Sequence, residues 1–199
     1  MVAPYGTVLT SAHCLCTIRY RMEKSLQRED WLRAARLALL RGGIGAVRVE
    51  KLARSLHVTK GSFYWHFRDR DDLLESLLRE WENEVAEILP TLGRGAASQR
   101  LVALVRQLER RARLSEEGKV PSDAAIFAWA SVEPRVARRV NKADEKRFRL
   151  LARLGRQDQM ELFYLVWLGF VARGQRVPES RKRFPEIARA MLKLFRVVS

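Results

Sequence analysis

Apolar residues recur along this chain with the spacing of amphipathic helices. Leu32, Ala35 and Leu39 lie three and then four residues apart, which places them on one face of a helix. Gly42 and Gly43 follow and are typical of a helix end. The same apolar period returns in later segments, at about 49–56, 71–89, 98–114, 122–130, 134–154, 160–172 and 185–198. No stretch alternates apolar and polar residues as a strand does, so the pattern predicts an all-α protein.

Polar residues at the edges of these segments predict where helices begin. Thr59 is a candidate N-cap for a short helix that follows the break at His57. Asp69, with Asp72 three residues later, resembles a capping pair for the long helix that ends at Pro90. Residues 174–184 are expected to form a polar loop before the last helix.

Residues 28–72 are expected to hold three helices, of which the second and third are short and joined by a tight turn. This is the spacing of a helix-turn-helix. On the third helix Phe63 and Phe67 share one face and are expected to pack inward. A helix this short cannot bury its other faces. The residues there suit DNA: Gly61 permits close approach, while Lys60 and Ser62 can bond base edges. Phosphates can be bonded by Tyr64 and His66. An ordinary core role for Tyr64, Trp65 and His66 is the less favoured alternative.

The charge balance favours a polyanionic partner. The 199 residues include 38 Lys and Arg against 23 Asp and Glu, giving a net charge of +15. Nucleic acid is the first candidate partner of such a surface and an acidic membrane surface the second. Arg outnumbers Lys by 30 to 8, which could also reflect a GC-rich genome. Between Arg28 and Arg68 there are nine basic residues, Arg48 among them, and three acidic ones. This local excess matches the electrostatic footprint of a DNA-binding module.

Residues 49–74, VEKLARSLHVTKGSFYWHFRDRDDLL, resemble the N-terminal DNA-binding domain of the tetracycline-repressor (TetR) family. The resemblance covers about 45 of the 199 residues. It implies an all-α homodimer with a DNA-binding domain at 22–70 and an effector-binding and dimerisation domain at 71–199. It also implies roles for single residues. The DNA-binding candidates are Lys60, Gly61 and Ser62 at bases, Tyr64, Trp65, His66 and Arg70 at phosphates, Thr59 as a cap near a phosphate, and Arg48.

His57 departs from the family pattern, which usually has glycine at this turn position. Glycine suits the left-handed conformation that ends the second helix. Histidine tolerates that conformation at a modest cost. His57 could therefore weaken the turn or add a phosphate contact, and both readings stay open.

The larger domain carries less specific signals. Leu162–Val171 is apolar in every direction, which predicts burial on all sides. With the apolar stripe of the last helix (Ile187, Met191, Leu194, Phe195 and Val198) it predicts a four-helix dimer interface; a wholly internal helix is the alternative. Six aromatic residues could line an effector cavity or be plain core, namely Trp81, Phe127, Trp129, Phe163, Tyr164 and Trp167. No buried-looking charged residue in this region stands out as a ligand anchor.

The sequence lacks the residue patterns of enzymes, metal sites and membrane-spanning proteins. The three histidines are His13, His57 and His66, and no catalytic set or nucleotide-binding motif occurs, so we expect no enzyme and no cofactor. Cys14 and Cys16 exclude a disulfide framework and a zinc site built on cysteine pairs, and no metal is expected. No apolar run approaches the ~20 residues of a membrane span. We expect a cytoplasmic protein associated with the nucleoid.

Residues 1–21 show no helical or strand period and are expected to be disordered. We favour an upstream extension before a true start at Met22; a flexible basic arm that touches DNA is the alternative.

Together these patterns predict a ligand-responsive transcriptional repressor that binds a palindromic operator as a homodimer and contacts a small-molecule effector. The alternative is a basic helical protein-interaction module that keeps the fold without reading an operator.

Overall fold

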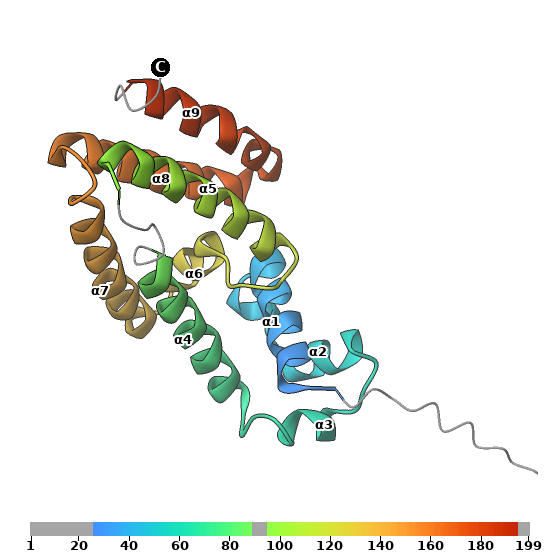
Figure 1. Cartoon of the computed structure of the whole chain (residues 1–199). Coiled ribbons are helices and arrows are strands. Elements are labelled where there is room, and N and C mark those ends of the chain that lie inside the picture. The colour runs from blue at the N-terminus through green and yellow to red at the C-terminus, as the bar shows by residue number, and fades with distance from the viewer. Residues whose placement is uncertain (1–25, 89–94, 195–199) are drawn as a thin grey trace, which may run out of the picture.

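The computed structural model describes residues 26–88 and 95–194, and these form helices and connecting turns with no strand among them (Figure 1). The α-helices are α1 (Arg28–Gly42), α2 (Val49–Ser55), α3 (Lys60–Tyr64), α4 (Arg70–Ile88), α5 (Ala97–Glu116), α6 (Asp123–Ala130), α7 (Pro134–Leu151), α8 (Gln157–Arg176) and α9 (Phe184–Leu194). Two 3₁₀ helices are η1 (Ile44–Ala46) and η3 (Pro178–Arg183). The all-α prediction is confirmed. The expectations for residues 1–21, Pro90, Phe195 and Val198 lie outside the described residues.

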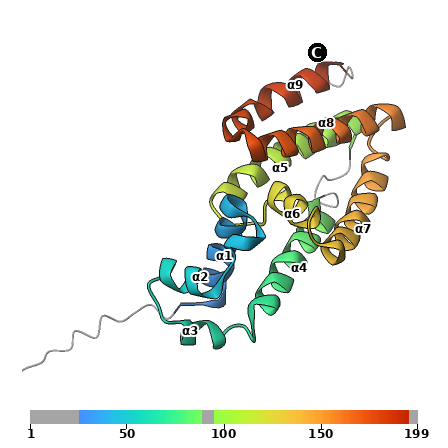
Figure 2. The same cartoon turned by 180° about the vertical axis from the view of Figure 1, so that it is seen from behind.

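The helices form an elongated arrangement. The short helices α2 and α3 lie at one end beside α1, and α9 lies at the opposite end next to α5 and α8 (Figures 1 and 2). The long helix α4 runs from the α3 end toward the body formed by the later helices (Figure 1). The predicted helix-turn-helix is therefore presented at a tip of the molecule.

Local signals placed several helix ends correctly. Gly43 ends α1 with φ of +65°, and its N–H donates to the Leu39 carbonyl over 3.0 Å. The Asp72 N–H donates to Asp69 Oδ1 over 2.8 Å, and the Arg68 N–H donates to Asp72 Oδ2 over 3.1 Å. Thr59 is at the N-cap position of α3, although its side chain makes no capping hydrogen bond.

The polar loop predicted at 174–184 is largely helical. Helix α8 continues to Arg176, and the 3₁₀ helix η3 fills most of the remainder. The Ser180 N–H donates to the Val177 carbonyl over 2.9 Å, and Lys182 pairs with Glu179 over 2.7 Å. Polar side chains can remain in solvent while the backbone closes short i to i+3 turns, so polarity alone did not indicate a loop.

Two hydrophobic cores organise the molecule. The first joins α1–α4 to α6 and α7, with Trp31, Phe63 and Ile126 fully buried within it. The second joins α5, α8 and α9 around buried side chains such as Leu101 and Met160. The first core crosses the boundary expected near residue 70. The helix-turn-helix end is therefore packed directly against part of the C-terminal body.

None of the helices in the described ranges is both long and apolar enough to span a membrane.

Candidate functional site

The turn between α2 and α3 contains a residue in the left-handed region. His57 has φ of +58°, and within residues 26–88 and 95–194 it is the one non-glycine residue with positive φ. The turn is closed by the His57 N–H bonding the Arg54 carbonyl over 3.2 Å and the Val58 N–H bonding the Ala53 carbonyl over 3.0 Å. The chain thus forms the turn with histidine where glycine is the less strained residue.

The inward face of α3 fixes which residues point outward. Phe63 is fully buried and meets Trp31 of α1 edge-on, with ring centroids 5.3 Å apart. Phe67 stacks on Phe63 at 5.3 Å and is also buried. The prediction for these two residues is confirmed. Because they anchor one face of the helix against α1, the opposite face is turned to solvent.

That opposite face carries large aromatic side chains in solvent. Trp65 is 88% exposed and Tyr64 is 60% exposed. Lys60 and Gly61 are exposed, while Ser62 and His66 are half-buried. An exposed tryptophan is unusual in a folded chain and points to a contact surface. The core role considered for Tyr64 and Trp65 is excluded by this exposure.

Gly61 is not required by packing within the chain. A Cβ atom placed there would lie 3.6 Å from Thr59 Oγ1, an ordinary contact, and Gly61 has a helical backbone. The small side chain instead leaves the surface of α3 open to close approach by a partner.

The basic candidates divide into two groups. Lys60 Nζ bonds Glu50 Oε1 at 2.7 Å, and this contact holds the pKa of the Glu50 carboxyl below its ordinary value. Arg48 is exposed and donates to the Gly45 carbonyl over 3.1 Å. Arg70 lies apart, because its guanidinium donates to the carbonyls of Val47 and Ile44 over 2.6 and 2.9 Å. It ties the start of α4 to the segment before α2, and its side chain is half-buried.

Arg68 was not among the site candidates drawn from the sequence. Its side chain is 86% exposed just beyond α3, although it contacts Asp72 at 3.7 Å. The signal was present in its position two residues after His66, but a basic residue before a helix reads equally well as a solvated surface charge.

The six aromatic candidates for an effector cavity do not gather around one cavity. Trp81 and Trp129 pack in the first core, whereas Phe163, Tyr164 and Trp167 pack in the second, and Phe127 packs against both. Trp81 is fully buried, and its indole N–H donates to Asp123 Oδ1 over 2.6 Å. Among the six, Trp167 alone lines the cavity described next. Helical spacing identified these residues as buried but could not assign them to different cores.

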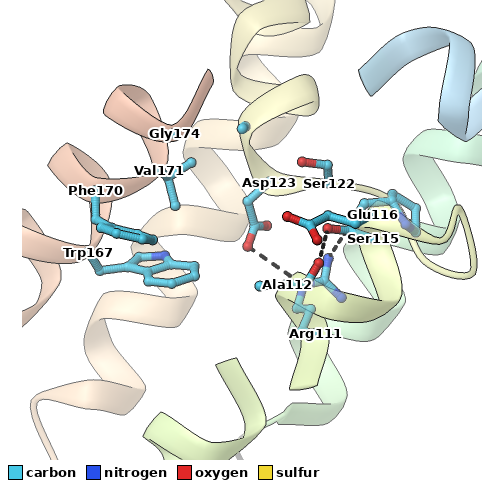
Figure 3. A pocket seen from close by; sticks show the side chains of 12 residues that line it. Arg111, Ala112, Ser115, Glu116, Ser122, Asp123, Trp167, Phe170, Val171 and Gly174 are labelled. Carbon is cyan, nitrogen blue, oxygen red and sulfur yellow. Dashed lines mark hydrogen bonds and ion pairs between the residues drawn. The ribbon is translucent and has the colours of Figure 1, made fainter. Parts of the chain in front are cut away.

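A small cavity lies between α5, the start of α6 and α8 (Figure 3). Its volume is about 60 Å³, several times the roughly 10–15 Å³ that one water needs on this measure. Trp167 and Phe170 stand on one side and Arg111 with Asp123 on the other (Figure 3). The cavity therefore combines an apolar wall with a charged one, which is typical of small-molecule sites.

The charged wall belongs to a buried ionic cluster. Asp123 is 8% exposed and accepts bonds at Oδ1 from Trp81 and, over 3.3 Å, from Arg147. Arg111 donates to the Pro121 carbonyl over 3.1 Å and pairs with Glu84. Burial opposes ionisation of Asp123, but Arg147 and Arg111 hold the pKa of its carboxyl below the ordinary value. Burial also lowers the pKa of the Arg111 guanidinium, against the attraction of Asp123.

From the sequence no buried-looking charged residue stood out as a ligand anchor in this domain, whereas the structure buries Arg111, Asp123 and Arg147. Asp123 resembled a surface residue of the first helical turn, and the two arginines lie in strongly basic stretches. A signal existed, because Arg111 follows Leu104 by seven residues and Leu108 by three, on the apolar face of α5. Arg147 likewise follows Val140 by seven residues on the apolar face of α7.

The segment between α5 and α6 is bonded directly to α1. Arg36 is buried, and its Nε donates to the Gly118 carbonyl over 2.6 Å while Nη1 bonds Glu80 of α4 over 2.7 Å. Arg33 donates to the Glu117 carbonyl over 3.3 Å. Gly118 has φ of +70°, and a Cβ there would come within 2.6 Å of the Leu37 side chain. The cavity wall at Pro121 is thus three residues from a close contact with the DNA-binding end.

Comparison with known proteins gives a family for the N-terminal region and a fold for the whole chain. Residues 32–77 match the family model for bacterial regulatory proteins of the tetR family. Curated proteins provide no significant match.

Several solved structures share the architecture. A transcriptional regulator of the "TerR/AcrR family" from Aquifex aeolicus VF5 has a TM-score of 0.62 at 13% identity, covering 86% of this chain and 99% of that one. A transcriptional regulator from Rhodococcus sp. Rha1 gives 0.61 at 19% identity, covering 84% and 97%. The reduced form of NemR from E. coli gives 0.53 at 18% identity, covering 86% and 97%.

These TM-scores establish a common fold over most of the chain, and the family match covers the helix-turn-helix that carries the exposed α3 face. The N-terminal domain is thus similar to that of the tetR family of bacterial regulatory proteins, and the chain as a whole shares its fold with solved transcriptional regulators.

Proposed function

We propose that this protein is a homodimeric, ligand-responsive transcriptional repressor whose α3 helix enters the major groove of a palindromic operator. The observation that supports DNA binding is the outward face of α3. On this face Trp65 is 88% exposed and lies near Lys60 and Gly61, and Gly61 leaves the helix surface open to a partner. A helix-turn-helix presents its second helix to the groove in this way. Such a protein acts in the cytoplasm, at the nucleoid.

The side chains of α3 divide by chemistry. Lys60 and Ser62 can donate to base edges, and Gly61 allows the backbone to come close. Tyr64, Trp65 and His66 would contact the phosphate backbone of the DNA. Thr59, Arg48 and Arg68 would contact phosphates at the edges of the same surface. Arg70 acts by positioning, because its bonds to the Val47 and Ile44 carbonyls hold the segment that leads into α2.

The exposed face of α8 supports a dimer. Leu162 and Leu165 are 45% and 58% exposed, and Gly169 on the same face has open space around its Cβ position. Asp158 lies exposed near the start of this face, and Arg173 and Arg176 lie exposed near its end. Antiparallel pairing with a second α8 would bury the leucines and set each acidic end against a basic one.

Helix α9 contributes less to the proposed dimer than the sequence suggested. Ile187 is half-buried and Ala188 and Leu192 are buried, because the apolar stripe of α9 packs into the core with α5 and α8. The four-helix interface therefore rests mainly on α8, and α9 would take part through its margins.

Ligand response is supported by the short route from the cavity to the DNA-binding end. Arg111 in the cavity wall bonds the Pro121 carbonyl, and the same segment is held to α1 by Arg36 at Gly118. A ligand that moves Arg111 would shift the connection between α5 and α6, which is hydrogen-bonded to α1 through Arg36. The ligand would alter DNA affinity to the extent that it binds one conformation of the protein, with high or with low DNA affinity, more tightly than the other.

The proposal is tested by fluorescence anisotropy of the full chain with labelled DNA from the intergenic region beside its own gene. The measurement is run at two salt concentrations against scrambled competitor DNA. We expect one dimer per site and binding that resists the competitor. Binding that the competitor abolishes and salt erases would be charge attraction alone, and the interaction-module alternative would then be favoured.

A further inference from the structure

The cavity beside α8 contains a buried donor, Arg111 Nε, that faces a carboxylate oxygen of Asp123 without hydrogen-bonding to it. Within the described residues Arg111 Nε has no hydrogen-bond partner, although the arginine is only 9% exposed. The nearest acceptor described is Asp123 Oδ2, at 3.6 Å, which is beyond hydrogen-bond distance. The bonds described for Asp123 from Trp81 and Arg147 both go to its other oxygen, Oδ1.

A buried guanidinium N–H left without an acceptor is costly. The group that would complete this site must accept a hydrogen bond from Arg111 and donate one to Asp123, because the first is a donor only and the ionised second is an acceptor only. A hydroxyl does both. A carboxylate can only accept and would be repelled by Asp123, and an ammonium can only donate and would be repelled by Arg111.

The charge of the wall agrees with a neutral group. Arg111 contributes one positive charge to the lining, and Asp123 and Glu116 contribute two negative charges. Arg111 is further neutralised by its pairing with Glu84. An incoming anion would therefore meet no net positive charge to offset the loss of its hydration.

The opposite wall is apolar and includes two aromatic rings. Trp167 and Phe170 project from α8 toward the charged wall (Figure 3), and Val171 of the same helix also lines the cavity. The Trp167 ring is held edge-on by Phe184, with centroids 5.4 Å apart. The volume of about 60 Å³ is smaller than the roughly 150 Å³ of a cavity that holds benzene, so the ligand is limited to a single ring, part of which lies at the open side of the cavity.

Resting on the ligand response proposed above, we propose that this cavity binds a small neutral molecule with a planar apolar ring and a hydroxyl group. The ring packs against Trp167 and Phe170, and the hydroxyl accepts from Arg111 Nε and donates to Asp123 Oδ2. The class is that of simple phenols.

The test uses 4-fluorophenol as the probe and follows its ¹⁹F NMR line width and shift with the full chain in the absence of DNA. The comparison compounds are 4-fluoroanisole, which cannot donate, 4-fluorobenzoate, which is anionic, and 4-fluorobenzylamine, which is cationic. We expect saturable binding of 4-fluorophenol and at least tenfold weaker binding of the other three. Equal binding of all four, or none of the phenol, would overturn the proposal.

A matched pair of variants locates the site. Ala112→Leu adds a larger side chain to the cavity lining, whereas Ala128→Leu makes the same change at an exposed position of α6 outside it. We expect Ala112→Leu to weaken 4-fluorophenol binding at least tenfold and Ala128→Leu to leave it unchanged. Ala124→Leu, on the α6 side of the lining, replaces Ala112→Leu if that variant loses its helical circular dichroism. Binding that survives the filled cavity contradicts the proposal.

A separate titration keeps this inference distinct from the proposed regulation. DNA affinity is measured with and without saturating 4-fluorophenol. Phenol binding that leaves DNA affinity unchanged would support the ligand class and contradict the ligand response. A change in DNA affinity that Ala112→Leu does not affect would contradict the ligand site alone.

Discussion

Two surfaces of this protein leave large apolar side chains in solvent, and they differ in what surrounds them. The α3 surface (Lys60, Gly61, Tyr64 and Trp65) combines aromatic rings that carry polar tips with basic neighbours. The α8 surface (Leu162, Leu165 and Gly169) is aliphatic and small, with charges confined to its two ends. Aromatic rings with a polar tip suit a contact that is part apolar and part wet. Aliphatic side chains have no hydrogen-bonding group and suit another apolar surface.

Exposure alone therefore does not identify a partner, whereas exposure together with its neighbours does. The α3 surface fits a polyanion and the α8 surface fits a second copy of the chain. Variants of the α3 surface should change DNA affinity, and variants of the α8 surface should change dimerisation. DNA affinity and oligomeric state are therefore measured separately for each variant.

The largest effect is expected from Leu162→Glu combined with Leu165→Glu. Pairing of two such α8 surfaces would bring four carboxylates together and bury them without partners, at a cost of several kcal/mol. We expect the protein to become monomeric by sedimentation velocity and to lose high-affinity DNA binding as a consequence, since one monomer reaches one half-site. Val132→Glu, an exposed apolar position outside the α8 surface, is the control and should remain dimeric. If the double variant stays dimeric, the proposal that α8 forms the dimer interface is wrong.

Tyr64→Ala should break the DNA contact and spare the dimer. A hydrogen bond to a charged phosphate contributes roughly 1.5–3 kcal/mol, and both subunits lose it, so DNA affinity should fall about 100-fold or more. Tyr64→Phe retains the ring and separates the hydroxyl from the packing of the aromatic side chain. Anisotropy gives the affinity, and sedimentation shows whether the dimer persists. Unchanged DNA binding in Tyr64→Ala would favour the interaction-module alternative.

Glu50→Gln should strengthen DNA binding. It removes a carboxylate beside the phosphate-facing surface and frees Lys60 from an ion pair of 2.7 Å that is half exposed on both sides. Exposed pairs are worth about 1 kcal/mol or less, so we expect a rise of roughly three- to fivefold at low salt that fades at high salt. Glu145→Gln removes the same charge from exposed α7, and its effect should be smaller. An equal rise in both variants would indicate a change in net charge only.

The smallest effect is expected from His57→Gly. It relieves a left-handed conformation that costs a non-glycine residue roughly 1–2 kcal/mol, partly offset by the greater freedom of glycine in the unfolded chain. We expect the melting temperature measured by circular dichroism to rise by a few degrees. DNA affinity decides the remaining question about this residue. An unchanged affinity means that His57 only strains the turn, and a tenfold loss means that it also contacts a phosphate.

The sequence predicted the DNA-binding end more accurately than the C-terminal body. Phe63 and Phe67 could be assigned to the core and Tyr64 and Trp65 to the surface because α3 is short and its period is clear. Arg70 shows the limit of that reasoning. Its place in the motif suggested a phosphate contact, but the carbonyls of Val47 and Ile44 lie within its reach only after the chain has folded.

In the C-terminal body the same helical period was less informative. The apolar stripe of α9 indicated a buried face, and the structure shows that this face packs against α5 and α8 of its own chain. Leu162 and Leu165 were expected to be buried and are exposed in the single chain, which leaves their face of α8 open for the proposed second copy.

The sequence by itself determined the helices, several of their ends and the outward face of α3, because spacing, capping pairs and helix-ending glycines act over a few neighbouring residues. Only the tertiary structure decided which buried charges contact one another and which of the aromatic candidates lines the cavity. Arg111, Asp123, Arg147 and Trp167 come from four consecutive helices, α5 to α8. Their contacts depend on how those helices pack, and no local pattern carries that information.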